Sequence, residues 1–234
     1  MSVTIIDYLI LIFILSYGLL GYKRGVFKQT IIFVGTILVF VISYKFKNVI
    51  GDFLVLNLPF FDFKNILNGA VSLNIILYQA IGFLLVSVVL TIIFKILVAI
   101  TGVFEKILRF TIILGIPSKI LGLIVGLIEG YIISFIILFV LYQPMFNINK
   151  LNESKYASTI LNKSPILSNI AEDSLETVEE IYELYDIKDA NTLNLEIIDI
   201  VLEKDVTSVE IIEKLLEKDK LRINNIDTVL NKYK

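Results

Sequence analysis

The sequence contains no cysteine, no histidine and no tryptophan among its 234 residues. Without cysteine, the chain cannot form disulfides, thiolate nucleophiles, cysteine-ligated zinc sites or iron–sulfur sites. Without histidine, it cannot build a Ser-His-Asp triad, an H-E-x-x-H zinc site or an imidazole proton shuttle. Any remaining chemistry would have to use carboxylates as metal ligands or general bases. We expect no metal, no cofactor and no catalytic residues.

Apolar residues dominate what is present, at 56% of the chain with a mean hydropathy of +0.83. The net charge of −2 conceals an uneven distribution, because residues 1–147 carry +5 and residues 148–234 carry −7. All 12 glycines and all 16 phenylalanines also lie in the first part. This change of composition predicts a boundary near Asn147, between a membrane domain (1–147) and an acidic helical C-terminal region (148–234).

Four segments of the first part are long and apolar enough to cross the hydrocarbon core of a bilayer, which takes about 20 residues. They are Val3–Leu20, Val26–Tyr44, Ile75–Ile100 and Ile120–Tyr142. Buried helices of a large soluble protein are the alternative, but these 147 residues include too few polar residues to cover them. The first segment lacks a basic start and a cleavage site, so we expect a retained helix rather than a signal peptide. The predicted fold class is an all-α polytopic membrane protein, with the lipid bilayer as its first partner.

Basic residues in the connections predict the orientation. The first and third connections lie on one side and together carry six cations, Lys23, Arg24, Lys28, Lys106, Arg109 and Lys119. The second connection carries three, Lys45, Lys47 and Lys64, offset by Asp52 and Asp62. This difference places the Lys23–Lys28 hairpin in the cytoplasm and both termini outside it. A re-entrant segment would instead place the acidic region in the cytoplasm.

Two stretches resemble neither a membrane span nor a polar loop. Phe53–Leu73 and Val103–Ile116 mix apolar and charged residues, a pattern typical of amphipathic segments that lie in the membrane interface. A re-entrant or pore-lining role is the alternative interpretation.

Small residues recur at every fourth position of the predicted fourth helix. They are Gly122, Gly126, Gly130 and Ser134, and a similar set, Gly18, Gly21 and Gly25, ends the first helix. Small residues on one helix face let two backbones approach closely inside a membrane. The spacing predicts a packing seam, with the first and fourth helices as neighbours. The same seam would also suit association of two copies of the chain.

Three ionisable side chains fall within the predicted spans. Glu129 borders the glycine seam, Lys95 lies near the end of the third helix, and Asp7 lies near the start of the first. Such groups usually face the interior of a helix bundle. Glu129 and Lys95 can reach similar depths and pair, and Lys95 can instead extend to the interface. Asp7 is either a carboxylate in the membrane interface or a charge at a helix N-terminus.

Four short stretches carry a family resemblance. They read Ile5-Ile6-Asp7-Tyr8, Gly21-Tyr22-Lys23-Arg24-Gly25-Val26-Phe27-Lys28, Ser118-Lys119-Ile120-Leu121-Gly122 and the glycine run from Gly122 to Gly130. Over about residues 3–146, the chain resembles the CvpA family, the bacterial colicin V production proteins. Gln29, Ser118 and Glu129 depart from the pattern, where the family often has an acid, an Asp and an Arg. The resemblance implies a four-helix bacterial inner-membrane protein linked to colicin V production or export, and it implies no reaction.

The acidic C-terminal region keeps a helical spacing of apolar residues. Ser164-Pro165 is typical of a helix start, and Thr207-Ser208-Val209-Glu210 matches a capping box. We expect three or four amphipathic helices, which form a small bundle or lie on the membrane surface. Their net charge argues against nucleic-acid binding and leaves a protein partner as the functional interpretation.

Two functions follow from these patterns. The first is a non-enzymatic accessory or scaffold protein in toxin production, export or envelope maintenance. The second is a small oligomeric transporter or channel that uses Glu129, Lys95 or Asp7. An enzyme would need acids that converge, whereas Asp7 and Glu129 are expected near opposite membrane faces.

Overall fold

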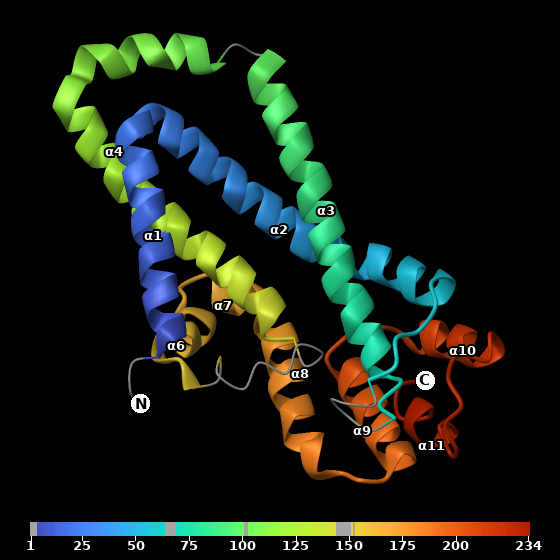
Figure 1. Ribbon diagram of the computed structural model, residues 1–234. Coiled ribbons are helices and arrows are strands. Elements are labelled where there is room, and N and C mark those ends of the chain that lie inside the picture. Colours follow the sequence, from blue (N-terminus) through green and yellow to red (C-terminus); the bar gives the residue numbers. More distant parts are fainter. Residues whose placement is uncertain (1–3, 64–68, 101–102, 144–150, 152) are drawn as a thin grey trace. The chain divides into compact units, whose positions relative to one another are not determined.

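The computed structural model describes residues 4–63, 69–100, 103–143, 151 and 153–234. For residues 103–114 and 185 it describes the backbone alone. Within these ranges the chain is all-α, without a strand (Figure 1). Four of the described helical stretches are long and apolar enough to cross a membrane, Ile5–Arg24, Val26–Asn57, Leu73–Ile100 and Gly115–Leu141. The prediction of an all-α, multi-pass membrane protein is therefore confirmed.

Helix α1 (Ile5–Arg24) has defined signals at both ends. Thr4 caps its N-terminus and exchanges hydrogen bonds with Asp7 in a capping box. At the C-terminus, the Gly25 N–H donates to the Gly21 carbonyl, and Gly25 adopts a φ of +74°. Glycine tolerates this left-handed region without steric cost. Helix α2 begins at the next residue, so the predicted hairpin contains a single non-helical residue.

Helix α2 (Val26–Asn57) is longer than predicted. At 1.5 Å per residue its 32 residues span about 48 Å, whereas a hydrocarbon core is about 30 Å thick. Lys45, Lys47 and Phe53, which the sequence predicts in the connection and the interface, lie within the helix. The extension is possible because its polar groups have partners, since the Lys47 ammonium donates to the Ser174 hydroxyl at 2.9 Å. Of the predicted interface segment, 64–68 lie outside the described residues.

Helix α3 (Leu73–Ile100) follows the predicted third span closely, and helix α4 (Val103–Leu141) differs from the predicted fourth. A break at Gly115, with φ 52° and ψ −127°, divides α4, two residues before Pro117. Proline has no N–H to donate and its ring clashes with the preceding turn, so a helix bends or breaks there. Figure 1 shows the sharp turn between the two parts of α4. Residues 103–114 are helical as expected, and their position at an interface stays a prediction.

The C-terminal region contains more helices than expected. They are α6 (Lys155–Lys163), α7 (Leu167–Ile170), α8 (Glu172–Glu183), the 3-10 turn η2 (Leu184–Asp186), α9 (Ala190–Glu203), α10 (Val209–Glu217) and α11 (Asp227–Leu230). Ser164 ends α6 instead of starting a helix, because its hydroxyl donates back to the Ile160 carbonyl. The cap of α10 is Ser208, one residue after the predicted Thr207, since its hydroxyl oxygen accepts from the Ile211 N–H.

The chain forms two compact units. Unit 1 consists of Met1–Ser43, Ser87–Val140 and Ile148–Ser168, and unit 2 of Tyr44–Val86, Leu141–Asn147 and Asn169–Lys234. The C-terminal region thus contributes to both units. The boundary near Asn147 falls outside the described residues, so the predicted domain division stays a prediction.

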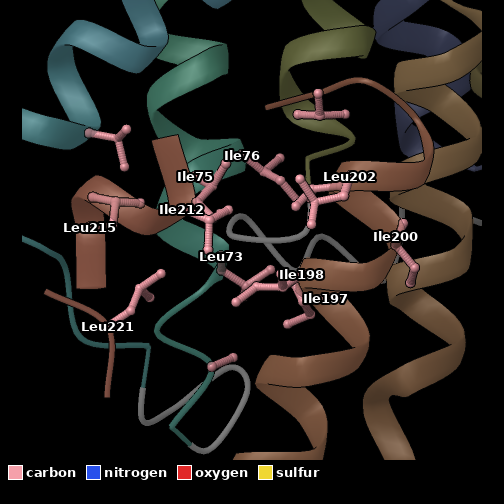
Figure 2. Packing of buried hydrophobic residues seen from close by; sticks show 14 of the residues in the cluster. Leu73, Ile75, Ile76, Ile197, Ile198, Ile200, Leu202, Ile212, Leu215 and Leu221 are labelled. Carbon is pink, nitrogen blue, oxygen red and sulfur yellow. The ribbon is translucent and has the colours of Figure 1, made fainter. Parts of the chain in front are cut away.

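Unit 2 has a core of large aliphatic side chains. Figure 2 shows Leu73, Ile75 and Ile76 from the start of α3 among side chains of α9 and α10. Ile197 and Ile198 of α9 are fully buried in this cluster. The helices of residues 190–217 therefore pack on the beginning of α3.

Candidate functional site

The glycines of α1 and α4 lie against each other within unit 1. A Cβ atom added at Gly21 would lie 3.0 Å from the Gly126 Cα, and one added at Gly122 would lie 2.8 Å from the Gly25 carbonyl carbon. One added at Gly130 would lie 3.1 Å from the Ile14 Cα. The two backbones are thus in direct contact along the spacing that the sequence shows.

The other predicted seam positions differ in what they contact. A Cβ added at Gly18 would lie 2.7 Å from a methyl group of Leu127, so this position packs on a side chain. The buried Ser134 hydroxyl donates to the Gly130 carbonyl of its own helix at 2.7 Å. The contact between α1 and α4 is therefore mainly a glycine contact.

The first hairpin is also joined to the start of the α4 span. The Val26 N–H, the first of α2, donates to the Ser118 hydroxyl at 3.3 Å. An unpaired N–H at a helix start needs such an acceptor. Ser118 therefore supplies an acceptor at a position where the resemblance leads us to expect an Asp.

Glu129 is buried, at 2% exposure, and its carboxylate joins two elements. The Gln29 side-chain amide donates to one oxygen, and the Thr36 hydroxyl donates to the other at 3.2 Å. The Gln29 carbonyl in turn accepts from the Arg24 guanidinium at 3.3 Å. A continuous chain of hydrogen bonds thus runs from α1 through α2 to α4.

Lys95 does not take part in this network. The described partners of Glu129 are Gln29 and Thr36, so the suggested Glu129–Lys95 pair is not formed here. Sequence reasoning missed both partners as site residues. Gln29 and Thr36 are seven residues apart, which is two turns, so they lie on the same face of α2. This spacing of polar residues within a predicted span is the signal that indicates a shared partner.

A cavity of about 540 Å³ lies beside this network, with Arg24, Thr36 and Glu129 in its wall, and is lined by residues of all four spanning helices. Its wall is mostly apolar, with Phe40, Phe94 and Ile136 among the lining residues. Seven residues add polar groups: Tyr17, Arg24, Thr36, Ser87, Thr91, Lys95 and Glu129. Of the predicted cytoplasmic hairpin, Arg24 therefore faces a cavity, while Lys23 is exposed and Lys28 is half-buried.

Asp7 is fully buried at a different place, the N-terminus of α1. One carboxylate oxygen accepts from the Thr4 N–H at 2.7 Å and from its hydroxyl at 2.9 Å. The other accepts from the Ser154 hydroxyl and the Tyr156 N–H, both at 2.7 Å. Asp7 thereby joins the first turn of α1 to the first turn of α6, which lie side by side in Figure 1.

The family model described as Colicin V production protein matches residues 6–165 of the sequence. The chain belongs to this family. The match covers more than half of the chain and continues past the predicted limit near residue 146 to include α6. No curated protein and no solved structure matches the chain.

The matched range includes both the hydrogen-bond network of Glu129 and the contact of Asp7 with α6, which we call the Asp7 anchor. Asp7, Glu129 and the glycines of α1 and α4 all lie within the colicin V production family region, as do Ser154 and Tyr156. Helices α7 to α11 lie after it. The family region therefore contains every contact between helices of unit 1 described above.

Proposed function

We propose that this colicin V production family protein acts without catalysis, as an accessory or scaffold protein in toxin production, export or envelope maintenance. The observation that supports this proposal best is that both buried carboxylates, Asp7 and Glu129, accept hydrogen bonds that join one helix to another. Glu129 joins α4 to α2, and Asp7 joins α1 to α6, each through hydrogen bonds to both oxygens. Carboxylates held in this way stabilise an assembly of helices.

The proposed location is the bacterial inner membrane, with both termini outside the cytoplasm. Four spans bring the N-terminus of α1 and the region after α4 to the same side, and the contact between Asp7 and α6 agrees with this topology. The cations of the first hairpin favour the cytoplasm for the opposite side. Partners would then meet the C-terminal helices outside the cytoplasm. A homo-oligomer through the glycines would require α1 to exchange between copies.

A small transporter or channel is the second candidate, because Glu129 and Lys95 line one cavity among the spanning helices. Ion coupling needs a carboxylate that gains and loses charge, whereas a joint between helices needs only hydrogen bonds. Glu129→Gln separates these requirements, since glutamine cannot ionise and its oxygen still accepts from Gln29. Its amide can donate to the Thr36 hydroxyl, which has the Ile32 carbonyl as another acceptor.

Secretion of colicin V and ion flux test the two candidates together. The chain is expressed in a colicin V producer that lacks its own family member, and secreted killing activity is measured. We expect wild type and Glu129→Gln to restore secretion, and neither to support proton or ion flux in proteoliposomes. Flux that Glu129→Gln abolishes would establish the transporter instead. If the chain reaches the membrane and fails to restore secretion, the role in colicin V production is wrong.

A further inference from the structure

The cavity of unit 1 combines an apolar wall with two cations that are not neutralised by direct contact. Arg24 donates to the neutral Gln29 carbonyl, and this leaves most of its guanidinium donors available. Lys95 is exposed, and no ion pair or hydrogen bond is recorded for it within the described part of the chain. Both residues line the cavity. The cavity therefore offers cationic donors beside an apolar space.

The cations lie toward one end of the helices that form the cavity. Arg24 is the last residue of α1, and Lys95 lies about 8 Å along α3 from its end at Ile100. Ser87, another lining residue, lies about 20 Å from the same end. This length is close to the depth of one bilayer leaflet, which is about 15 Å of hydrocarbon. A headgroup at the cations and a chain beside Phe40 and Ile136 would match this distribution.

A buried polar atom in the wall gives a second, independent observation. The Ser87 hydroxyl oxygen is inaccessible, with no hydrogen-bond partner among the described residues. Buried polar groups nearly always have a partner, and a bound water, ion or other molecule is one explanation of an unpaired one. Rotation of the Ser87 side chain into the cavity would let its hydroxyl donate to an acceptor atom of a bound molecule.

We propose that this cavity binds one anionic phospholipid, whose phosphate contacts Arg24 and Lys95 and whose acyl chain occupies the apolar part. The charge of the lining residues selects an anion, because Arg24 and Lys95 outnumber the single carboxylate of Glu129. Glu129 already accepts hydrogen bonds from Gln29 and Thr36, so its carboxylate does not require a bound cation. This site is independent of the accessory role proposed above, which requires no lipid ligand.

Lipid binding to the delipidated, full-length protein in detergent tests the proposal. Native mass spectrometry counts the adducts formed with phosphatidylglycerol, with phosphatidylcholine and with inorganic phosphate. We expect a single tight phosphatidylglycerol adduct that excess phosphatidylcholine and inorganic phosphate do not displace. Lys95→Gln should weaken it roughly tenfold, since one charge-assisted contact to phosphate is lost.

Two further variants keep the test decisive. Lys23→Gln removes an exposed hairpin cation that does not line the cavity, and it should leave the affinity unchanged. Arg24→Gln should weaken the adduct as Lys95→Gln does. Among the described residues no hydrogen bond or ion pair holds Lys95, so Lys95→Gln decides the question if Arg24→Gln fails to fold. Equal affinity in Lys95→Gln and wild type would overturn the proposal, as would equal losses in Lys95→Gln and Lys23→Gln. Displacement by inorganic phosphate would show a free anion site instead of a lipid site.

Discussion

The contact between α1 and α4 in unit 1 and the core of unit 2 are built from opposite kinds of residue. In unit 1, Gly21, Gly122 and Gly126 bring two backbones together. In unit 2, fully buried Ile197, Ile198 and other large aliphatic residues fill the space between helices. The difference shows how solvent determines packing. Helices surrounded by lipid gain little from burying apolar side chains, so they depend on close approach and hydrogen bonds, whereas helices that leave water gain from apolar burial.

The comparison predicts that the two units respond oppositely to side-chain size, and the core of unit 2 should show the largest effect. Ile198→Ala should lower the free energy of unfolding by roughly 3–4 kcal/mol, through lost burial and the cavity that it leaves. Hydrogen-exchange mass spectrometry of the full-length protein in detergent should show faster exchange in α9 and α10. Val49→Ala is the control, since Val49 is 64% exposed. Equal losses in both variants would contradict the importance of the core.

Unit 1 should instead be sensitive to an increase in size. Gly126→Ile should destabilise the α1–α4 contact by about 3 kcal/mol, because its Cβ would lie only 3.1 Å from the Gly21 Cα. Faster exchange in α1 and altered cross-linking between α1 and α4 would report the change. Ile124→Val, at a position 48% exposed on the same helix, should have little effect. If Gly126→Ile retained wild-type cross-linking, the glycine contact would not hold these helices together.

The Asp7 anchor sharpens the comparison within unit 1, because it depends on hydrogen bonds instead of size. Asp7→Asn should cost roughly 2 kcal/mol, since an amide places donors where Ser154 and Tyr156 also donate. Faster exchange at the first turn of α6 measures this loss. Asp189→Asn provides the matched control, since Asp189 is an exposed N-cap and asparagine caps equally well. Unchanged protection of α6 in Asp7→Asn would show that the anchor is dispensable.

The smallest effect should come from the charged surface of unit 2, where Tyr233 and Lys232 donate to Asp199 at 2.7 and 2.6 Å. Burial tends to raise the pKa of Asp199, but hydrogen bonds from Lys232 and Tyr233 outweigh it and lower the pKa below 3.8. Burial and the bond to Asp199 raise the pKa of Tyr233 to about 12.

The sign of each shift sets the pH window of this contact. The lowered pKa of Asp199 stabilises the fold above about pH 4, and this contribution is lost as the pH falls through the folded pKa. The raised pKa of Tyr233 stabilises the fold below pH 10, and this contribution is lost as the pH rises through 12. Asp199→Asn should lower Tm by about 2 °C or less between pH 5 and 9, and by less outside that range. A difference that does not vary with pH would contradict this assignment.

Part of this architecture could be predicted from sequence because its signals are local. Apolar runs of about 20 residues predict four spans, and glycines at every fourth position predict which helix faces meet. Other parts depended on residues far apart. Nothing local to Lys47 indicates that Ser174 will accept its hydrogen bond, so the sequence predicted the end of α2 about 13 residues too early. The same limit explains why Gln29 and Thr36 were not identified as partners of Glu129, which lies 100 residues after Gln29.

The sequence by itself determined that this protein is an all-α, multi-pass member of the colicin V production family with glycine-lined helices. These properties follow from composition and short-range spacing, which hold whatever the rest of the chain does. Only the tertiary structure decided that Glu129 is bonded to Gln29 and Thr36 instead of Lys95. It also decided that Asp7 anchors α6, a contact across 147 residues. The physical reason is that a buried polar group takes whichever partner the packing brings within about 3 Å, and packing is set by the whole fold.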